Sequence, residues 1–96
     1  MTVTADVTDG MLLDLVRGAV ATVMELKAEQ LGADTRLVED ISADSLAMIE
    51  IVEIVEEQLR DRGSAVRIDD DSLAGMLTLG DVVSAFAEAA RAGAPL

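Results

Sequence analysis

The sequence predicts an all-α fold, a small antiparallel helical bundle with three main helices, one short helix and a long first loop. Apolar residues make up 51% of the 96 residues, but Phe86 is the one aromatic residue. The core must therefore consist of Leu, Ile, Val, Met and Ala, which suits helices packed on helices. Several segments repeat apolar residues every three or four positions, and none alternates as a strand does. A chain of this length has room for one hydrophobic core.

The first helix is expected to begin at Thr8 or Asp9, because either residue can cap a helix, and to continue to about Leu26. Its apolar residues fall at steps of three and four, so they form one stripe of an amphipathic helix. This stripe consists of Leu12, Val16, Ala19, Val20 and Val23.

The helical period is lost in residues 27–44, where Gly, Asp, Thr and Ser are typical of an ordered loop. The same segment contains four aliphatic residues, Leu31, Leu37, Val38 and Ile41. An exposed linker would not carry so many apolar side chains. We therefore expect the loop to cross the core and to be held there by these four residues.

The second helix is expected to begin at Ser45, with Asp44 as its N-cap, and to continue to about Arg60. On a helical wheel of about 100° per residue, one arc contains the expected core residues Met48, Ile51, Val52, Val55 and Leu59. A narrow arc on the other side contains Leu46 among Glu50, Glu53 and Glu57. Leu46 is therefore expected to be exposed.

These three glutamates have no lysine in the helix at a spacing of three or four residues. Like charges at that spacing destabilise a helix. A partner surface with basic groups and a small apolar pocket would explain both the unpaired glutamates and the exposed Leu46. The alternative is an ordinary solvated surface, because glutamates are common on outer helix faces and a single exposed leucine needs no special role.

The rest of the chain predicts one short helix and the start of another. The short helix, of one or two turns, is expected from about Asp71 or Ser72 to Met76. Thr78 and Asp81 have the spacing of a capping box, in which each side chain bonds the backbone of the other residue. A further helix should therefore start directly after Thr78.

This last helix is expected to extend from Leu79 to about Ala92, with four residues turned inward: Val82, Val83, Phe86 and Ala90. Residues 1–7 and 93–96 show no helical period and are expected to be flexible ends. The folded domain is therefore expected to span residues 8–92.

The formal net charge is −12, from 19 Asp and Glu against 7 Lys and Arg. Such a charge repels nucleic acids and anionic membrane surfaces, and it favours association with basic patches on other proteins. Solubility alone is the alternative reason for the charge. The first twenty residues lack a signal-peptide pattern, and no apolar run approaches the length of a membrane span. We therefore expect a cytoplasmic protein with no nucleic-acid or membrane partner.

The chain contains no cysteine and no histidine. Thiolate nucleophiles, the usual zinc ligands and the commonest general base are therefore missing, and no catalytic or metal site is predicted. A nucleophilic Ser45 would need a base and an oxyanion hole, and "ADSLA" is not the Gly-x-Ser-x-Gly motif of serine hydrolases.

Ser45 has two remaining interpretations. It can simply begin a helix. However, Asp44 already occupies the capping position, so the hydroxyl of Ser45 should be free. The second interpretation is therefore an attachment point: a phosphate on this hydroxyl would lie at the positive end of the helix dipole. Asp40 and Asp44 would repel a simple anion, but they could help a modifying enzyme place Mg²⁺ or basic side chains.

Residues 28–59 resemble the loop and second helix of acyl carrier proteins, including the Asp-Ser-Leu tripeptide at 44–46, and residues 78–86, "TLGDVVSAF", resemble the start of their last helix. The resemblance covers roughly residues 9–91. It implies that Ser45 carries 4′-phosphopantetheine, which a phosphopantetheinyl transferase moves from coenzyme A. The thiol of this arm would hold acyl groups as thioesters, so the protein would be a carrier and not an enzyme.

The resemblance also implies a docking surface and a set of partners. A ketosynthase and other acyl-processing enzymes with basic patches would meet Asp44, Leu46, Met48, Glu50, Glu53 and Glu57. The aliphatic interior could shelter a growing chain, and the carrier alone is expected to be a monomer.

Three positions depart from the pattern of the family. Ser42 stands where glycine is frequent, Ala47 replaces a polar or acidic residue, and Ala33 replaces a proline. Residues 60–67 are longer than their counterpart and rich in arginine, so this segment could influence which enzyme docks, or could be only a variable surface loop.

Together with the Ala-, Val-, Asp-, Gly- and Arg-rich composition, these departures favour a free-standing bacterial carrier of type II polyketide or related specialised biosynthesis. A housekeeping fatty acid carrier and an aminoacyl or peptidyl carrier are the alternatives, and the acidic second helix favours acyl cargo. A hypothesis from another class is a non-catalytic acidic helical interaction module.

Overall fold

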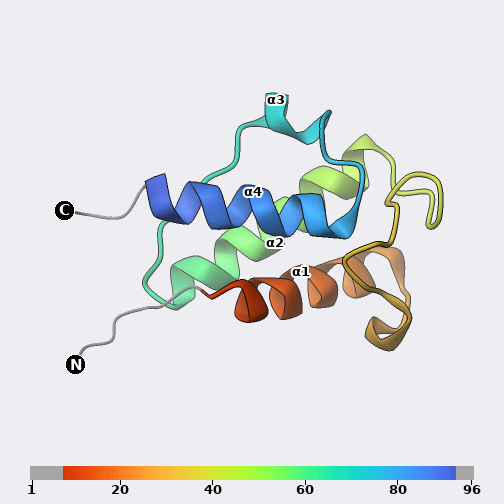
Figure 1. Cartoon of the computed structure of the whole chain (residues 1–96), viewed down its shortest axis with the longest axis horizontal. Coiled ribbons are helices and arrows are strands. Elements are labelled where there is room, and N and C mark those ends of the chain that lie inside the picture. The colour runs from red at the N-terminus through yellow and green to blue at the C-terminus, as the bar shows by residue number, and fades with distance from the viewer. Residues whose placement is uncertain (1–7, 93–96) are drawn as a thin grey trace.

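The computed structural model describes residues 8–92 and confirms the predicted all-helical bundle (Figure 1). Its helices are α1 (Asp9–Met24), a short 3₁₀ turn η1 (Ala28–Gln30), α2 (Ser45–Asp61), α3 (Asp70–Leu73) and α4 (Leu79–Ala92). The bounds of the three long helices agree with the predicted ones to within two residues. The expected flexible ends, residues 1–7 and 93–96, lie outside the described residues.

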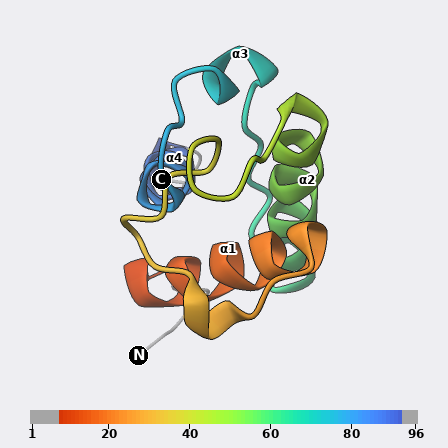
Figure 2. The same ribbon diagram turned by 90° about the vertical axis from the view of Figure 1, so that its right-hand side faces the viewer.

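Helix α1 is the element on which the two other long helices pack. It contacts both α2 and α4 and runs opposite to them, whereas α2 and α4 are not in close backbone contact with each other (Figure 1). Figure 2 shows α1 on one side of the bundle and α3 on the opposite side, between α2 and α4. The side of the interior that faces away from α1 is therefore bordered by α3 and its connections.

The core consists of the aliphatic stripes that the sequence predicts, together with Phe86. Side chains with no exposed surface come from each long helix and from the first loop, namely Leu12, Val16, Val20, Leu37, Ile51, Val55, Leu59, Leu79, Val82 and Phe86. Met48 and Val52 are also buried, as expected. Val23, Val83 and Ala90 are half-buried at the edge of this cluster.

The loop between α1 and α2 crosses the core, as predicted. Leu31 and Leu37 are buried, and Ile41 is half-buried. The prediction was wrong for Val38, whose side chain is 61% exposed. The backbone explains this: the Leu37 N–H donates to the Leu77 carbonyl (2.9 Å), and the Leu37 carbonyl accepts from the Ala43 N–H (2.8 Å). The chain turns around this buried anchor, and Val38 lies on the outside of the turn.

The same loop is bound to the start of α4. The N–H of Leu79 donates to the Thr35 carbonyl and that of Gly80 to the Ala33 carbonyl, both at 2.9 Å. A Cβ on residue 80 would lie 3.1 Å from the Ala33 carbonyl oxygen, so this close approach suits glycine. The loop therefore satisfies two N–H groups that a helix start leaves without an intrahelical acceptor.

The predicted capping box completes the start of α4. The Asp81 N–H donates to Thr78 Oγ1 (3.1 Å), and the Thr78 N–H donates to Asp81 Oδ2 (3.0 Å). Asp81 Oδ2 also accepts from the Leu77 N–H (2.8 Å). These backbone N–H groups, with Leu77 first, lower the pKa of Asp81 because they stabilise its ionised form.

The short helix α3 differs from the prediction, which extended it to Met76. It ends at Leu73, because the N–H groups of Gly75 and Met76 bond only three residues back, to the carbonyls of Ser72 and Leu73. The chain thus passes into tight turns, in which Gly75 is more easily accommodated than in a helix interior. Within residues 8–92, none of the helices has the length and apolar character needed to span a membrane.

Candidate functional site

Helix α2 begins as the sequence predicts. Asp44 is its N-cap: the Oδ1 atom accepts from the Ala47 N–H (2.8 Å), and the Asp44 carbonyl accepts from the Met48 N–H (2.9 Å). A carboxylate at this position both satisfies a backbone donor and compensates the positive end of the helix dipole. Ser45 is therefore held as the first residue of the helix.

The hydroxyl group of Ser45 is accessible. The residue is exposed, and its Oγ takes part in no hydrogen bond with any other described residue. The N–H groups of Ser45 and Leu46 also have no acceptor within residues 8–92. Donors of this kind at a helix start attract phosphate oxygens, so the position offers a free nucleophilic oxygen beside two groups that can bind a phosphate.

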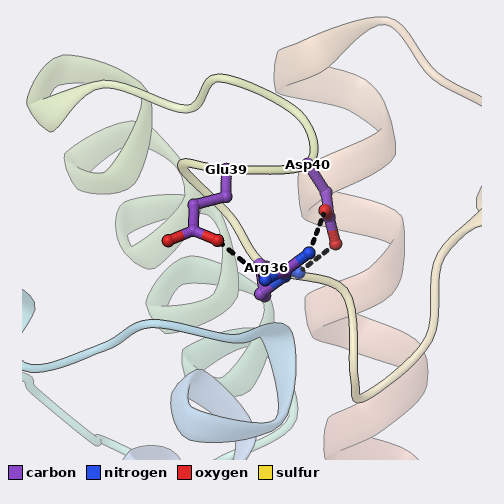
Figure 3. A network of polar contacts seen from close by, with 3 residues as sticks. All are labelled: Arg36, Glu39 and Asp40. Carbon is purple, nitrogen blue, oxygen red and sulfur yellow. Dashed lines mark hydrogen bonds and ion pairs between the residues drawn. The ribbon is translucent and has the colours of Figure 1, made fainter.

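The turn before α2 is held together by Arg36 (Figure 3). Its guanidinium contacts Glu39 Oε1 (2.8 Å) and Asp40 Oδ1 (3.3 Å), and its backbone N–H donates to Asp40 Oδ2 (2.8 Å). The hydrogen bond from this N–H and the nearby guanidinium lower the pKa of Asp40, although desolvation acts in the opposite direction. The carboxylates of Asp40 and Asp44 therefore both fix the geometry of the loop before α2.

Most of the predicted docking residues lie on the surface beside Ser45. Leu46 is 64% exposed, and Asp44 is exposed too. Glu50, Glu53 and Glu57 are exposed along the same face of α2, and none of the three forms an ion pair with a described residue. The charge of this face is therefore not compensated within the described part of the chain.

Met48 is the exception among these residues. Its side chain is only 5% exposed and belongs to the core cluster, where the helical wheel also placed it. The structure gives no support to a direct contact between this side chain and a docked enzyme.

Sequence reasoning missed two exposed hydrophobic residues near the start of α2 and α4. Val38 is 61% exposed and Leu77 is 67% exposed. The backbone of Leu77 is bound to that of Leu37, the neighbour of Val38, so the two exposed residues belong to adjoining segments. No periodic pattern covers these loop positions, and the sequence therefore contained no signal for the direction of their side chains.

The backbone explains one departure from the family pattern. Ser42 has φ 58°, in the left-handed region that glycine adopts without steric cost. Ser42 lies in the turn between the anchor Leu37 and the cap Asp44. Glycine at this position would fit the same turn with less strain.

The bundle and its exposed serine at a capped helix start are the features of a small carrier domain. Residues 14–86 match the family model described as phosphopantetheine attachment site. The chain is 36% identical to "Acyl carrier protein 3" of Ralstonia nicotianae, across 84% of this chain and 86% of that protein. It is 32% identical to "Acyl carrier protein" of Streptomyces coelicolor (95% and 92% covered) and 30% identical to that of Shigella flexneri (77% and 88%). The chain belongs to the phosphopantetheine-binding acyl carrier protein family.

Members of this family carry a covalently attached 4′-phosphopantetheine. When bound, this group supplies a terminal thiol that holds acyl chains as thioesters. The residues at the start of α2 fit it: Ser45 offers an exposed hydroxyl for a phosphodiester, and the N–H groups of Ser45 and Leu46 can donate to the phosphate oxygens. The chain itself has no cysteine, and this group would supply a thiol that its own residues do not.

Replacement of Ser42 by glycine should stabilise the fold. Relief of the left-handed strain is expected to raise the free energy of unfolding by about 1 kcal/mol, which urea denaturation would measure. Ser84→Gly is the matched control, because Ser84 is an exposed residue inside α4. There the same change should lower the free energy of unfolding by roughly 0.5 kcal/mol. If Ser42→Gly destabilises the protein as Ser84→Gly does, residue 42 is not in the left-handed conformation in solution.

Proposed function

We propose that Ser45 is the attachment residue of 4′-phosphopantetheine and that the protein presents acyl intermediates to other enzymes without a catalytic activity of its own. The observation that carries this proposal is the free, exposed hydroxyl of Ser45 at the capped start of α2, inside the segment that matches the family. The transfer would join Ser45 Oγ to the phosphate of pantetheine and break the pyrophosphate bond of coenzyme A. The serine proton is lost, and the adenosine bisphosphate half is released.

The acidic face of α2 is the proposed docking surface for partner enzymes. Its residues are Asp44, Leu46, Glu50, Glu53 and Glu57. The absence of ion pairs for Glu50, Glu53 and Glu57 among the described residues supports this role, because a basic patch on a partner would compensate them. Leu46 would add an apolar contact beside Ser45. A phosphopantetheinyl transferase, a ketosynthase and other acyl-processing enzymes are the proposed partners.

The proposed cargo is an acyl chain of type II polyketide or related specialised biosynthesis. The departures at Ser42, Ala47 and Ala33 and the composition support this choice over a housekeeping fatty acid carrier. The relatives bear the general name acyl carrier protein, which fits both pathways. The acidic α2 favours acyl over aminoacyl cargo.

Loading of the purified chain tests the attachment residue. Incubation with coenzyme A, Mg²⁺ and a phosphopantetheinyl transferase of broad specificity should add the mass of one phosphopantetheine group, as measured by intact-protein mass spectrometry. Ser45→Ala should gain no mass, whereas Ser42→Ala should load like the wild type. Loading of Ser45→Ala would contradict the assignment, and so would an unmodified wild-type chain under conditions that load a known carrier.

Reversal of two charges tests the docking surface. In Glu50→Lys/Glu53→Lys, repulsion between the carrier and a basic enzyme surface should raise the KM for loading on the order of tenfold, with little change in kcat. Glu29→Lys/Glu88→Lys is the matched control, because it makes the same change in net charge at exposed residues of η1 and α4. An equal rise in KM for both double variants would show that net charge, and not this face of α2, governs docking.

A further inference from the structure

Arg36 is the only basic residue in residues 28–59, the segment that contains Ser45 and the acidic face of α2. Its guanidinium lies between two acidic side chains of the same loop (Figure 3). Nη1 is 2.8 Å from Glu39 Oε1, and Nη2 is 3.3 Å from Asp40 Oδ1. The one cation of this segment therefore compensates the acidic loop, while the glutamates on the outer face of α2 form no ion pair among residues 8–92.

The Arg36 cluster lies directly before the start of α2. The Ala43 N–H donates to the Leu37 carbonyl (2.8 Å), so the residue next to Arg36 is bonded to the residue next to the Asp44 cap. Ser45 is consequently at the junction of two acidic segments. The loop segment has its charge partly compensated, and the helix segment does not.

The two carboxylates of the cluster are held in different ways. Asp40 Oδ2 accepts from the Arg36 N–H, and the Asp40 N–H donates to the Arg36 carbonyl, both at 2.8 Å. These bonds belong to the backbone of Arg36 and do not need its guanidinium. The Glu39 side chain is 69% exposed, and its contact with the guanidinium is its one polar contact within the described part of the chain. Removal of the guanidinium would therefore free Glu39 above all and leave the turn closed.

We propose that Arg36 is a positioning residue that occupies the carboxylates of Glu39 and Asp40, so that the basic groups of a partner enzyme are directed to the acidic face of α2. This inference rests on the proposed function. An enzyme whose basic patch extended over the loop would meet the Arg36 guanidinium, and like charges at an interface select against such a partner. The partner surface that faces the loop is then neutral or apolar. Val38, which is 61% exposed between Arg36 and Glu39, fits such a surface.

The titration of Asp40 in the unloaded protein tests the ion pairs of Arg36. The hydrogen bond from the Arg36 N–H and the nearby guanidinium both lower the pKa of Asp40. In Arg36→Gln the backbone bond remains, so this pKa should rise part of the way towards its ordinary value, as followed by ¹³C NMR of the carboxyl group. Arg91→Gln is the matched control, because Arg91 is an exposed residue near the end of α4. An unchanged Asp40 titration in Arg36→Gln would overturn the proposal.

Loading kinetics test the effect on docking. With coenzyme A and a phosphopantetheinyl transferase of broad specificity, Arg36→Gln should lower the KM for the carrier about threefold, the size expected for one exposed ion pair. The kcat should change little, and added salt should reduce the difference in KM. A merely structural disturbance of the turn would not lower KM. Arg91→Gln makes the same change in net charge and should leave KM close to the wild-type value. An equal fall in KM for both variants would overturn the proposal.

A double-mutant cycle tests whether Glu39 is the carboxylate that Arg36 occupies. With Arg36 present, Glu39→Gln should raise KM no more than Glu29→Gln, a change at an exposed residue of η1. In the Arg36→Gln background, Glu39→Gln should remove most of the threefold gain, because Glu39 is then free to meet a basic group of the enzyme. Additive effects of the two changes would overturn the role given to Arg36. Failure of the wild type to load would instead contradict the proposed function itself.

Discussion

The buried side chain of Leu37 and the two backbone hydrogen bonds of this residue fix the loop on which the rest of the molecule depends. The N–H of Leu37 bonds the segment before α4, and its carbonyl bonds Ala43, one residue before the cap of α2. Ordering a long loop costs conformational entropy, which apolar burial and hydrogen bonds have to offset. Here the loop contributes apolar surface to the core and caps the start of α4, so both helices take their positions from it.

The site at Ser45 follows from this arrangement. Leu37 and the contacts of Arg36 hold the turn that brings Asp44 to the start of α2. The Asp44 carboxylate accepts the hydrogen bond from the Ala47 N–H, so the Ser45 hydroxyl is not needed to cap the helix. The hydroxyl consequently remains free and exposed. The outer face of α2 carries glutamates that form no ion pair among residues 8–92, which suits the proposed attachment of a group to Ser45 by another enzyme. On the opposite border of the interior, residues 65–76 make fewer hydrogen bonds to the long helices.

The features that the sequence could predict are those with local causes. The helices, the Asp44 cap and the box of Thr78 and Asp81 depend on residues three or four positions apart, and the wheel of α2 separates Leu46 from the core. The exposure of Val38 could not be predicted, because it depends on the backbone bond between the neighbouring Leu37 and the distant Leu77. The end of α3 is set by local bonds from Gly75 and Met76 to carbonyls three residues back, which the apolar pattern does not distinguish from a continuing helix. The bond between Glu56 and Ile68 joins residues twelve positions apart and has no sequence signature. The helical wheel placed Met48 in the core, whereas the family resemblance placed it on the docking surface, and the packing agrees with the wheel.

The first loop is part of the core, and two adjacent single variants test this anchoring directly. Leu37→Ala removes a fully buried side chain and should lower the free energy of unfolding by roughly 2–5 kcal/mol in urea denaturation. Val38→Ala removes an exposed side chain from the same turn and should change this free energy by no more than about 0.5 kcal/mol. Two equally small effects would contradict the account, because they would show that the loop is not anchored through Leu37.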